Sequence, residues 1–153
     1  PLQMTVAISA IANKGLLMRP HVVDKKIYRD GTVELVEAPP VRSVISVQAA
    51  ETLTKMLVST VENGYDRAKV PGYFVAGKTG TAQIPNEDTR GYSEDTIHTF
   101  VGYAPAYRPR FTVLVKVDRP QGVRFASESL AQVFSDIMTY LLTYYEVPPD
   151  FKS

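Results

Sequence analysis

The chain has 153 residues and a formal net charge of +1, with 44% hydrophobic and 22% charged residues, which are ordinary values for one globular domain. The near-neutral charge gives no basic excess of the kind that nucleic-acid binding requires. No apolar run reaches the length of about 20 residues that spans a membrane. The absence of cysteine excludes a disulfide scaffold, a thiolate nucleophile and a cysteine-ligated zinc site.

The chain opens on a predicted helix. Apolar residues recur at helical spacing through residues 2–13, and Gly15 follows as a C-terminal cap. Pro1 is the residue type favoured at the first helical position, and the apolar pattern begins at once. We therefore expect the sequence to begin inside a longer polypeptide.

A β-hairpin is predicted next. Apolar and polar residues mix through residues 22–28 and 32–36, on either side of Asp30-Gly31. An Asp-Gly pair between two such runs is a strong short-range hairpin signal. Residues 38–40, with the sequence Ala-Pro-Pro, then form a stiff linker.

Two further helices are predicted. Ser46 is the N-cap of the first, which ends at Asn63-Gly64 and carries apolar residues at helical spacing. The second runs from residue 129 to residue 145. Its apolar stripe comprises Leu130, Val133, Phe134, Ile137 and Leu141.

Three strands are predicted between these helices, at residues 73–83, 98–104 and 111–118. The last alternates cleanly, with its apolar odd-numbered residues on one face. Short connections favour an antiparallel meander, so we expect an α+β fold with an antiparallel sheet covered by helices. The connection at residues 84–97 is long, polar and acidic, and it indicates either a loop that gates a site or a solvated surface.

The informative segment is residues 76–83, with the sequence AGKTGTAQ. Its triplet Lys78-Thr79-Gly80 is a weak signal alone, since roughly a few per cent of unrelated chains of this length contain it by chance. Glycine inside a strand, however, marks a place where a ligand or another backbone approaches closely. Alternation puts Thr79 and Thr81 on one face and Lys78 on the other, and such a strand can receive an extended peptide.

These residues resemble a known family. The Lys-Thr-Gly triplet matches the K-T-G element of penicillin-binding proteins and serine β-lactamases. Residues 75–83 and 98–105 resemble consecutive strands of the class B penicillin-binding proteins in particular, and residues 1–3 and 11–15 also look like their pattern. The resemblance covers nearly the whole chain and implies a penicillin-binding or serine β-lactamase-like transpeptidase fold.

The site of that family uses three elements: a Ser-x-x-Lys nucleophile and base, a Ser-x-Asn, and the K-T-G strand. In this sequence no serine has lysine three positions on, and none has asparagine two positions on. A diverged, inactive homologue would also lack these elements. We expect instead that residues 1–153 are the carboxy-terminal portion of a single transpeptidase domain, with the nucleophile on an upstream segment outside this sequence.

The resemblance implies a role for each residue of the triplet and for Thr81. Lys78 would raise the local positive potential and help proton transfer around the serine pair. Thr79 and Thr81 would bind the carboxylate of the peptide substrate or of a β-lactam. The backbone N–H of Thr81 would form half of the oxyanion hole, and Gly80 would keep the strand bare for substrate. No metal or other cofactor is implied.

The implied enzyme is a serine D,D-transpeptidase that cross-links peptidoglycan stem peptides through an acyl-enzyme and is acylated by β-lactam antibiotics. Its expected partners are stem peptides, β-lactams, the upstream part of the same domain, and proteins of cell-wall synthesis or division, with no nucleic acid. The family is usually anchored by an N-terminal membrane helix, so we expect the extracytoplasmic face of the cytoplasmic membrane. Two alternatives stay open: a β-lactam hydrolase or sensor domain with the same strand, and a non-enzymatic scaffold.

Two segments depart from the pattern of the family. Residues 64–67, Gly-Tyr-Asp-Arg, are bulkier than the small residues expected there, and residues 125–132 lack a proline-containing helix entry. His98 is a further candidate, either as a proton shuttle or ligand or as a structural residue.

Overall fold

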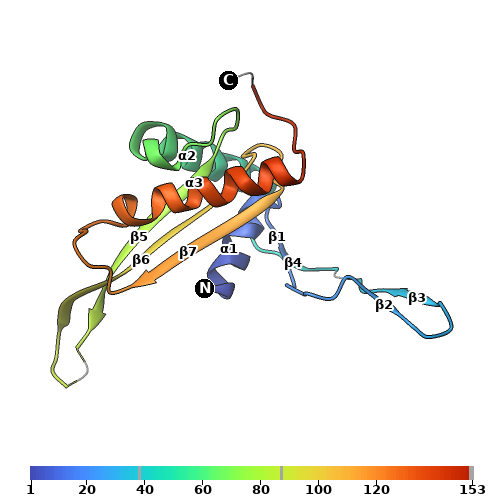
Figure 1. Cartoon of the computed structure of the whole chain (residues 1–153), viewed down its shortest axis with the longest axis horizontal. Coiled ribbons are helices and arrows are strands. Elements are labelled where there is room, and N and C mark those ends of the chain that lie inside the picture. The colour runs from blue at the N-terminus through green and yellow to red at the C-terminus, as the bar shows by residue number, and fades with distance from the viewer. Residues whose placement is uncertain (38, 87, 152–153) are drawn as a thin grey trace.

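The computed structural model describes residues 1–37, 39–86 and 88–151. Its centre is a three-stranded antiparallel sheet in the order β5-β6-β7 (Figure 1). The strands are β5 (Ala76–Pro85), β6 (Tyr92–Ala104) and β7 (Phe111–Asp118). Consecutive strands are neighbours, so the predicted meander is confirmed.

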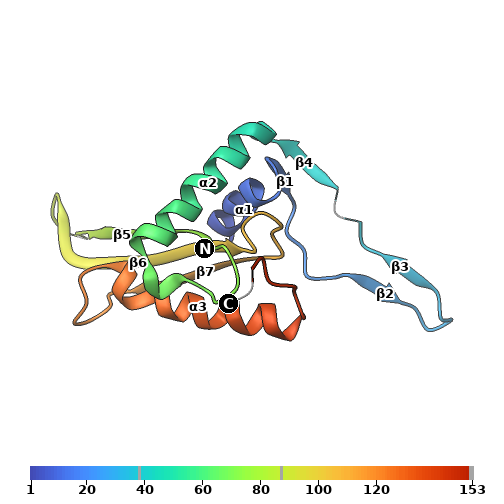
Figure 2. The same ribbon diagram turned by 90° about the horizontal axis from the view of Figure 1, so that it is seen from above.

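Helices lie on both faces of this sheet and beside its first strand. They are α1 (Leu2–Ala12), α2 (Val47–Gly64) and α3 (Ala126–Tyr144), and a 3-10 turn, η1 (Asp66–Ala68), follows α2. Helix α3 covers one face, α1 lies on the other, and α2 packs against β5 (Figures 1 and 2). The α+β fold with an antiparallel sheet covered by helices is therefore confirmed.

The main core lies between the sheet and α3. Phe100 from the middle of β6 packs on Phe134 of α3 with ring centroids 4.7 Å apart, and both side chains are fully buried. Val61 of α2 and the odd-numbered residues of β7 pack into the same layer, as the alternation of β7 predicted. Each buried aromatic ring removes about 150–250 Å² from water, so this pair contributes a large share of a small core. A second cluster around Tyr103 joins the sheet to α1 and α2.

Two short strand pairs connect α1 to α2. Their strands are β1 (Leu16–Met18) with β4 (Pro40–Ser43), and β2 (Lys25–Ile27) with β3 (Val33–Leu35). The predicted hairpin is thus confirmed, although its strands are shorter than the apolar and polar runs from which it was predicted. In both views the β2–β3 hairpin projects away from the rest of the molecule (Figures 1 and 2).

The β2–β3 hairpin has one polar and one apolar face. On the polar face the Glu34 carboxylate accepts hydrogen bonds from Lys26, at 3.1 Å, and from the Tyr28 hydroxyl. The apolar face is exposed and comprises Ile27, Val33 and Leu35. A two-stranded hairpin has little stability of its own in water, so these polar contacts are its main internal support.

Helix boundaries follow the predicted caps. The Ser46 hydroxyl accepts a hydrogen bond from the Ala49 N–H at 3.2 Å, which satisfies one free donor at the start of α2. At the end of α1 the Gly15 N–H donates to the Ala10 carbonyl at 2.7 Å, with φ at +89°. A Cβ at Gly15 would lie 2.1 Å from the Ile45 carbonyl oxygen, so the chain reversal requires glycine here.

The predicted long loop at residues 84–97 is wrong. Strand β5 continues to Pro85 and β6 begins at Tyr92, and the two strands pair as far as these residues. This end of the hairpin runs past the part of the sheet that β7 pairs, which begins at Ile97. Its described residues are exposed or half-buried and carry no apolar alternation, so the sequence pattern indicated a loop.

Other differences concern the ends of elements. Strand β5 begins later than predicted, at Ala76, and α3 begins earlier, at Ala126. Strands β1 and β4 were not predicted, and β4 includes Pro40 of the expected linker, whereas Ala38 lies outside the described residues.

The predicted apolar stripe of the last helix is confirmed only in part. Leu130 and Phe134 are buried against the sheet, whereas Val133 is 41% exposed and Ile137 is 39% exposed. The face that α3 turns to the sheet is centred on Phe134 and Met138, both fully buried. An exposed apolar strip therefore remains along one side of α3.

Candidate functional site

The strand that carries the Lys-Thr-Gly triplet lies at an edge of the sheet. Strand β5 pairs with β6 on one side, and within residues 1–37, 39–86 and 88–151 no strand pairs with its other side. An unpaired edge presents backbone N–H and C=O groups that an extended peptide can bind. The triplet therefore lies at an edge suited to a peptide that adds as a strand.

A groove of about 390 Å³ opens beside the triplet, between the sheet and α1. Its lining residues are Pro1, Met4, Ile8, Lys78, Thr79, Gly80, Thr99, Val101, Leu114 and Lys116. Lys116 pairs with the carboxylate of Asp118, whereas Lys78 has no carboxylate partner in the described part of the chain. A cation without a carboxylate partner favours an anionic ligand nearby.

The predicted alternation along β5 is confirmed. Thr79 lies opposite Phe100 in the strand register, and Phe100 packs on α3, so Thr79 belongs to the α3 face of the sheet. Thr81 shares that face, two residues on. Lys78 lies opposite Val101, which lines the groove on the other face.

The Lys78 side chain nevertheless reaches the α3 side around the strand edge. Its ammonium donates hydrogen bonds to the Thr79 carbonyl at 3.0 Å, to the Thr79 hydroxyl at 3.3 Å and to the Tyr65 hydroxyl at 3.3 Å. These contacts use all three N–H donors of the ammonium. Lys78 and Thr79 start from opposite faces of the sheet and meet at the open edge of β5.

Tyr65 is the residue of this site that the sequence analysis missed. Its hydroxyl lies 2.7 Å from the Thr79 hydroxyl oxygen, and its ring packs edge-on against Phe100 with centroids 5.8 Å apart. Burial raises the pKa of Tyr65, but hydrogen bonds with Thr79 and Lys78 and the charge of Lys78 together bring it below that of a free tyrosine. The only signal in the sequence was the unusual bulk of residues 64–67.

The Thr81 side chain contacts the start of α3. Its hydroxyl oxygen accepts a hydrogen bond from the backbone N–H of Ala126, the first residue of α3, at 3.2 Å. The hydroxyl proton of Thr81 is therefore free to donate to a ligand. The N-terminal end of a helix also carries a partial positive charge, which favours an anion close to Thr81.

Glycine at position 80 has a packing role that the sequence analysis did not foresee. A Cβ on Gly80 would lie 2.5 Å from the Thr99 hydroxyl oxygen on the neighbouring strand. A side chain at position 80 would therefore have to displace the Thr99 hydroxyl. Whether the glycine also leaves room for a substrate stays a prediction.

His98 lies inside the protein, opposite Thr81 in the strand register, with 0% of its surface exposed. One ring nitrogen is 3.0 Å from the Thr96 hydroxyl, and the other is 2.8 Å from the Ser129 hydroxyl on α3. Both ring nitrogens are therefore satisfied by the fold. This arrangement favours the structural role among the alternatives for His98.

Other kinds of site find no support in the described residues. No group of three or more histidine and carboxylate side chains is placed to hold a metal ion in the described ranges. Across the same ranges, no helix combines the length and apolarity needed to cross a membrane.

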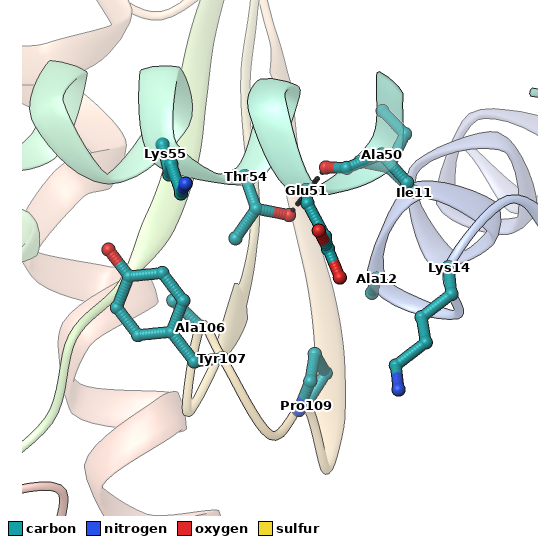
Figure 3. Close-up of a pocket in the computed structure, with 10 residues that line it drawn as sticks. All are labelled: Ile11, Ala12, Lys14, Ala50, Glu51, Thr54, Lys55, Ala106, Tyr107 and Pro109. Atoms are coloured by element: carbon teal, nitrogen blue, oxygen red, sulfur yellow. Dashed lines mark hydrogen bonds between the residues drawn. The ribbon is translucent and has the colours of Figure 1, made fainter. Parts of the chain in front are cut away.

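A separate pocket of about 280 Å³ lies between α1, α2 and the turn after β6 (Figure 3). Its polar lining residues include Lys14, Glu51 and Lys55. The Thr54 hydroxyl, also in the lining, donates a hydrogen bond to the Ala50 carbonyl and forms another with the Tyr103 hydroxyl. None of its lining residues comes from β5. The candidate site is therefore the edge of β5 and not this pocket.

The edge of β5 combines groups that suit an anion. It offers an ammonium, two threonine hydroxyl groups and the N-terminal end of α3 within one short stretch of strand. The charge of the ammonium and of the helix end attracts a carboxylate, and the hydroxyl groups can donate to it. A nucleophilic side chain activated by a base is not part of this arrangement.

Comparison with known proteins identifies the family in which this edge occurs. The family model described as penicillin binding protein transpeptidase domain matches residues 1–139. The chain is 37% identical over 158 residues to penicillin-binding protein PbpB of Mycolicibacterium smegmatis, covering 96% of this chain and 24% of that protein. It is 36% identical over 152 residues to the probable peptidoglycan D,D-transpeptidase PbpC of Pseudomonas aeruginosa, covering 97% of this chain and 25% of that protein.

A solved structure shows the same fold. Penicillin-binding protein 3 of Mycobacterium tuberculosis, crystallised in complex with ampicillin, matches with a TM-score of 0.85 and 33% sequence identity. The match covers 97% of this chain and 35% of that chain. The present chain thus spans about a quarter of the length of these curated relatives and about a third of the solved one.

Proposed function

Because this chain belongs to the penicillin-binding protein transpeptidase domain family, we propose that it forms the carboxy-terminal portion of a serine D,D-transpeptidase. The complete enzyme cross-links peptidoglycan stem peptides through an acyl-enzyme and is acylated by β-lactam antibiotics. Its nucleophilic serine lies on an upstream segment, since this sequence has neither Ser-x-x-Lys nor Ser-x-Asn. We call the present chain joined to that segment the complete domain.

One observation carries the proposal: Lys78, Thr79 and Thr81 come together at an open strand edge. Thr81 accepts from the N–H of Ala126, and its hydroxyl proton is free for a ligand. The Lys78 ammonium lies 3.3 Å from the Thr79 hydroxyl and adds positive charge. A substrate that adds to β5 as a strand would bring its terminal carboxylate to these donors.

The chemistry divides between this chain and the upstream segment. The serine oxygen attacks the carbonyl carbon of the D-Ala-D-Ala peptide bond, its proton passes to the neighbouring lysine base, and D-alanine leaves as the amine takes up a proton. The amine of a second stem peptide then attacks the ester, forms the new peptide bond and returns the proton to serine. The backbone N–H of Thr81 supplies half of the oxyanion hole, a donor typically worth about 3–4 kcal/mol in the transition state.

The setting of this activity follows from its substrate. Peptidoglycan stem peptides are cross-linked outside the cytoplasm, so the complete domain works at the extracytoplasmic face of the cytoplasmic membrane. Its further partners are proteins of cell-wall synthesis or division. The relative named as a probable peptidoglycan D,D-transpeptidase supports the choice of substrate.

Substitutions of Thr81 in the complete domain test the proposal through the rate of acylation by a fluorescent penicillin. Thr81→Pro removes the oxyanion N–H and distorts the strand, so acylation should fall by about 100-fold or more. Thr81→Val keeps the N–H but loses the hydroxyl, and should weaken carboxylate recognition by about tenfold with the fold nearly intact. Thr81→Ser is the matched control, and should remain close to wild type.

Lys78→Ala provides a second arm of the same experiment. The loss of its positive charge should slow acylation by orders of magnitude. The loss of stability should be small, because Lys78 is exposed and has no carboxylate partner among the described residues.

Equal acylation of wild type and Thr81→Pro would refute the assignment of this edge. Rapid release of hydrolysed penicillin from the acyl-enzyme would instead favour a β-lactam hydrolase.

A further inference from the structure

The hydroxyl of Tyr65 belongs to a closed three-membered network at the edge of β5. It lies 2.7 Å from the Thr79 hydroxyl and 3.3 Å from the Lys78 ammonium, and Lys78 is in turn 3.3 Å from the Thr79 hydroxyl. The edge-on packing of the Tyr65 ring against Phe100, at an interplanar angle of 74°, holds the phenol in this place. The position of the hydroxyl is therefore set by the core and not by the ligand.

Lys78 fixes one part of the hydrogen bonding in this network. Its ammonium has only donors, so both hydroxyl oxygens accept from it. The bond between the two hydroxyl groups can run in either direction, and in each case one hydroxyl proton, that of Tyr65 or that of Thr79, has no acceptor among the described residues. The pair of hydroxyl groups therefore holds the ammonium at the edge of β5 and keeps one proton for a ligand.

We infer that Tyr65 is a positioning residue for the recognition of the substrate carboxylate. By contacting both the Lys78 ammonium and the Thr79 hydroxyl, it holds these two groups in place at the edge of β5. This inference rests on the proposed function and deepens it, because it adds a residue outside the Lys-Thr-Gly strand to the carboxylate site. It also gives the bulky segment at residues 64–67 a specific role in place of a general effect on shape.

The test compares a penicillin with its methyl ester, which lacks the negative charge. In the complete domain, Tyr65→Phe keeps the ring against Phe100 and removes only the hydroxyl. The second-order rate of acylation by the free acid should fall about tenfold, in line with the loss of support for one charge-assisted hydrogen bond. The rate for the ester should change less than twofold, so the ratio of acid to ester rates falls.

Tyr73→Phe is the matched control. It removes a phenol hydroxyl that donates to the Val147 carbonyl, away from the edge of β5, and should leave the acid-to-ester ratio unchanged. If Tyr65→Phe slows acylation by both compounds equally, or by neither, Tyr65 does not position the groups that bind the carboxylate, and the inference is overturned. If the wild-type complete domain is acylated by neither compound, the proposed function fails and this inference fails with it.

A spectroscopic readout tests the network without acylation. In protein labelled with ¹³C at the tyrosine ζ carbon, Tyr65 should titrate at a lower pH than a free tyrosine, because Thr79 and Lys78 offset the effect of burial. Lys78→Ala removes a donor and a positive charge, so the Tyr65 resonance should then titrate at a higher pH. An unchanged titration in Lys78→Ala would show that the ammonium does not contact the phenol, and would overturn the inference.

Discussion

At the residue scale, the close approach of the sheet to α3 depends on Gly102. A Cβ at this position would lie 2.6 Å from the Ala76 carbonyl oxygen and 2.9 Å from the ring of Phe134. The carbonyl belongs to the backbone of β5 and cannot move aside without disturbing the strand pairing. Gly102→Ala should therefore destabilise the complete domain by about 1–3 kcal/mol in urea unfolding.

Gly64→Ala is the control for this substitution. Gly64 ends α2, and a Cβ there would meet nothing within 4 Å. Alanine should be neutral or stabilise by about 0.4–1 kcal/mol, because it restricts the unfolded chain. Equal unfolding midpoints for Gly102→Ala and Gly64→Ala would contradict the packing described for the sheet and α3.

The residues of the candidate site were only partly predictable. Alternation along a strand is a local rule, so the sequence correctly placed Thr79 and Thr81 on one face and Lys78 on the other. The Lys78 ammonium also contacts the Tyr65 hydroxyl, and Tyr65 is thirteen positions earlier in the chain. No periodicity or motif links two such positions, so this contact required the structure.

At the element scale, the start of α3 is attached to the sheet through Ser129 and His98. The Ser129 hydroxyl is 2.8 Å from a ring nitrogen of the buried His98, and the first N–H of α3 donates to Thr81. Ser129→Ala should leave that ring nitrogen unsatisfied and cost about 1–3 kcal/mol of stability. It should also loosen the hydrogen bond from Ala126 and so reduce penicillin acylation of the complete domain.

Ser127→Ala offers a matched control two positions before Ser129. Ser127 is half-buried in the same turn of α3, and its side chain makes no hydrogen bond in the described part of the chain. Its removal should change unfolding by less than about 0.5 kcal/mol. A Ser129→Ala variant as stable as Ser127→Ala would mean that His98 does not anchor α3.

Elements with a buried face were predicted well, and elements without one were not. Strand β7 was predicted with its observed bounds, because its odd-numbered residues pack against α3 and alternate accordingly. Strands β1 and β4 have three and four residues, with no fully buried position. Such short exposed strands pair because neighbouring elements bring them together, and their sequences show no hydrophobic alternation.

At the scale of the whole molecule, the outer edge of the sheet and one side of α3 are uncovered in the described residues. In the described part of the chain, β7 has no strand partner on its outer side. Along α3 an apolar strip also remains exposed, comprising Val133, Ile137, Tyr140 and Tyr144. Open edges of this kind pair with other chains, so we expect residues 1–153 expressed alone to self-associate and to lack a cooperative monomeric unfolding transition.

Sedimentation and calorimetry of residues 1–153 and of the complete domain test this expectation. The complete domain should sediment as a monomer and unfold in one cooperative transition, because we expect the upstream segment to cover these surfaces. A monomeric and cooperative transition for residues 1–153 alone would contradict the expectation that they are the carboxy-terminal portion of one domain.

The projecting β2–β3 hairpin has a consequence for how this sequence can evolve. Its strands pair with each other and stand apart from the sheet, from α3 and from the edge of β5 (Figure 2). A substitution at Ile27 or Leu35 should alter neither the buried core nor the edge of β5. We therefore expect selection for stability and for the proposed catalysis to act only weakly on this hairpin, so that its residues change more freely during evolution than those of the Lys-Thr-Gly strand.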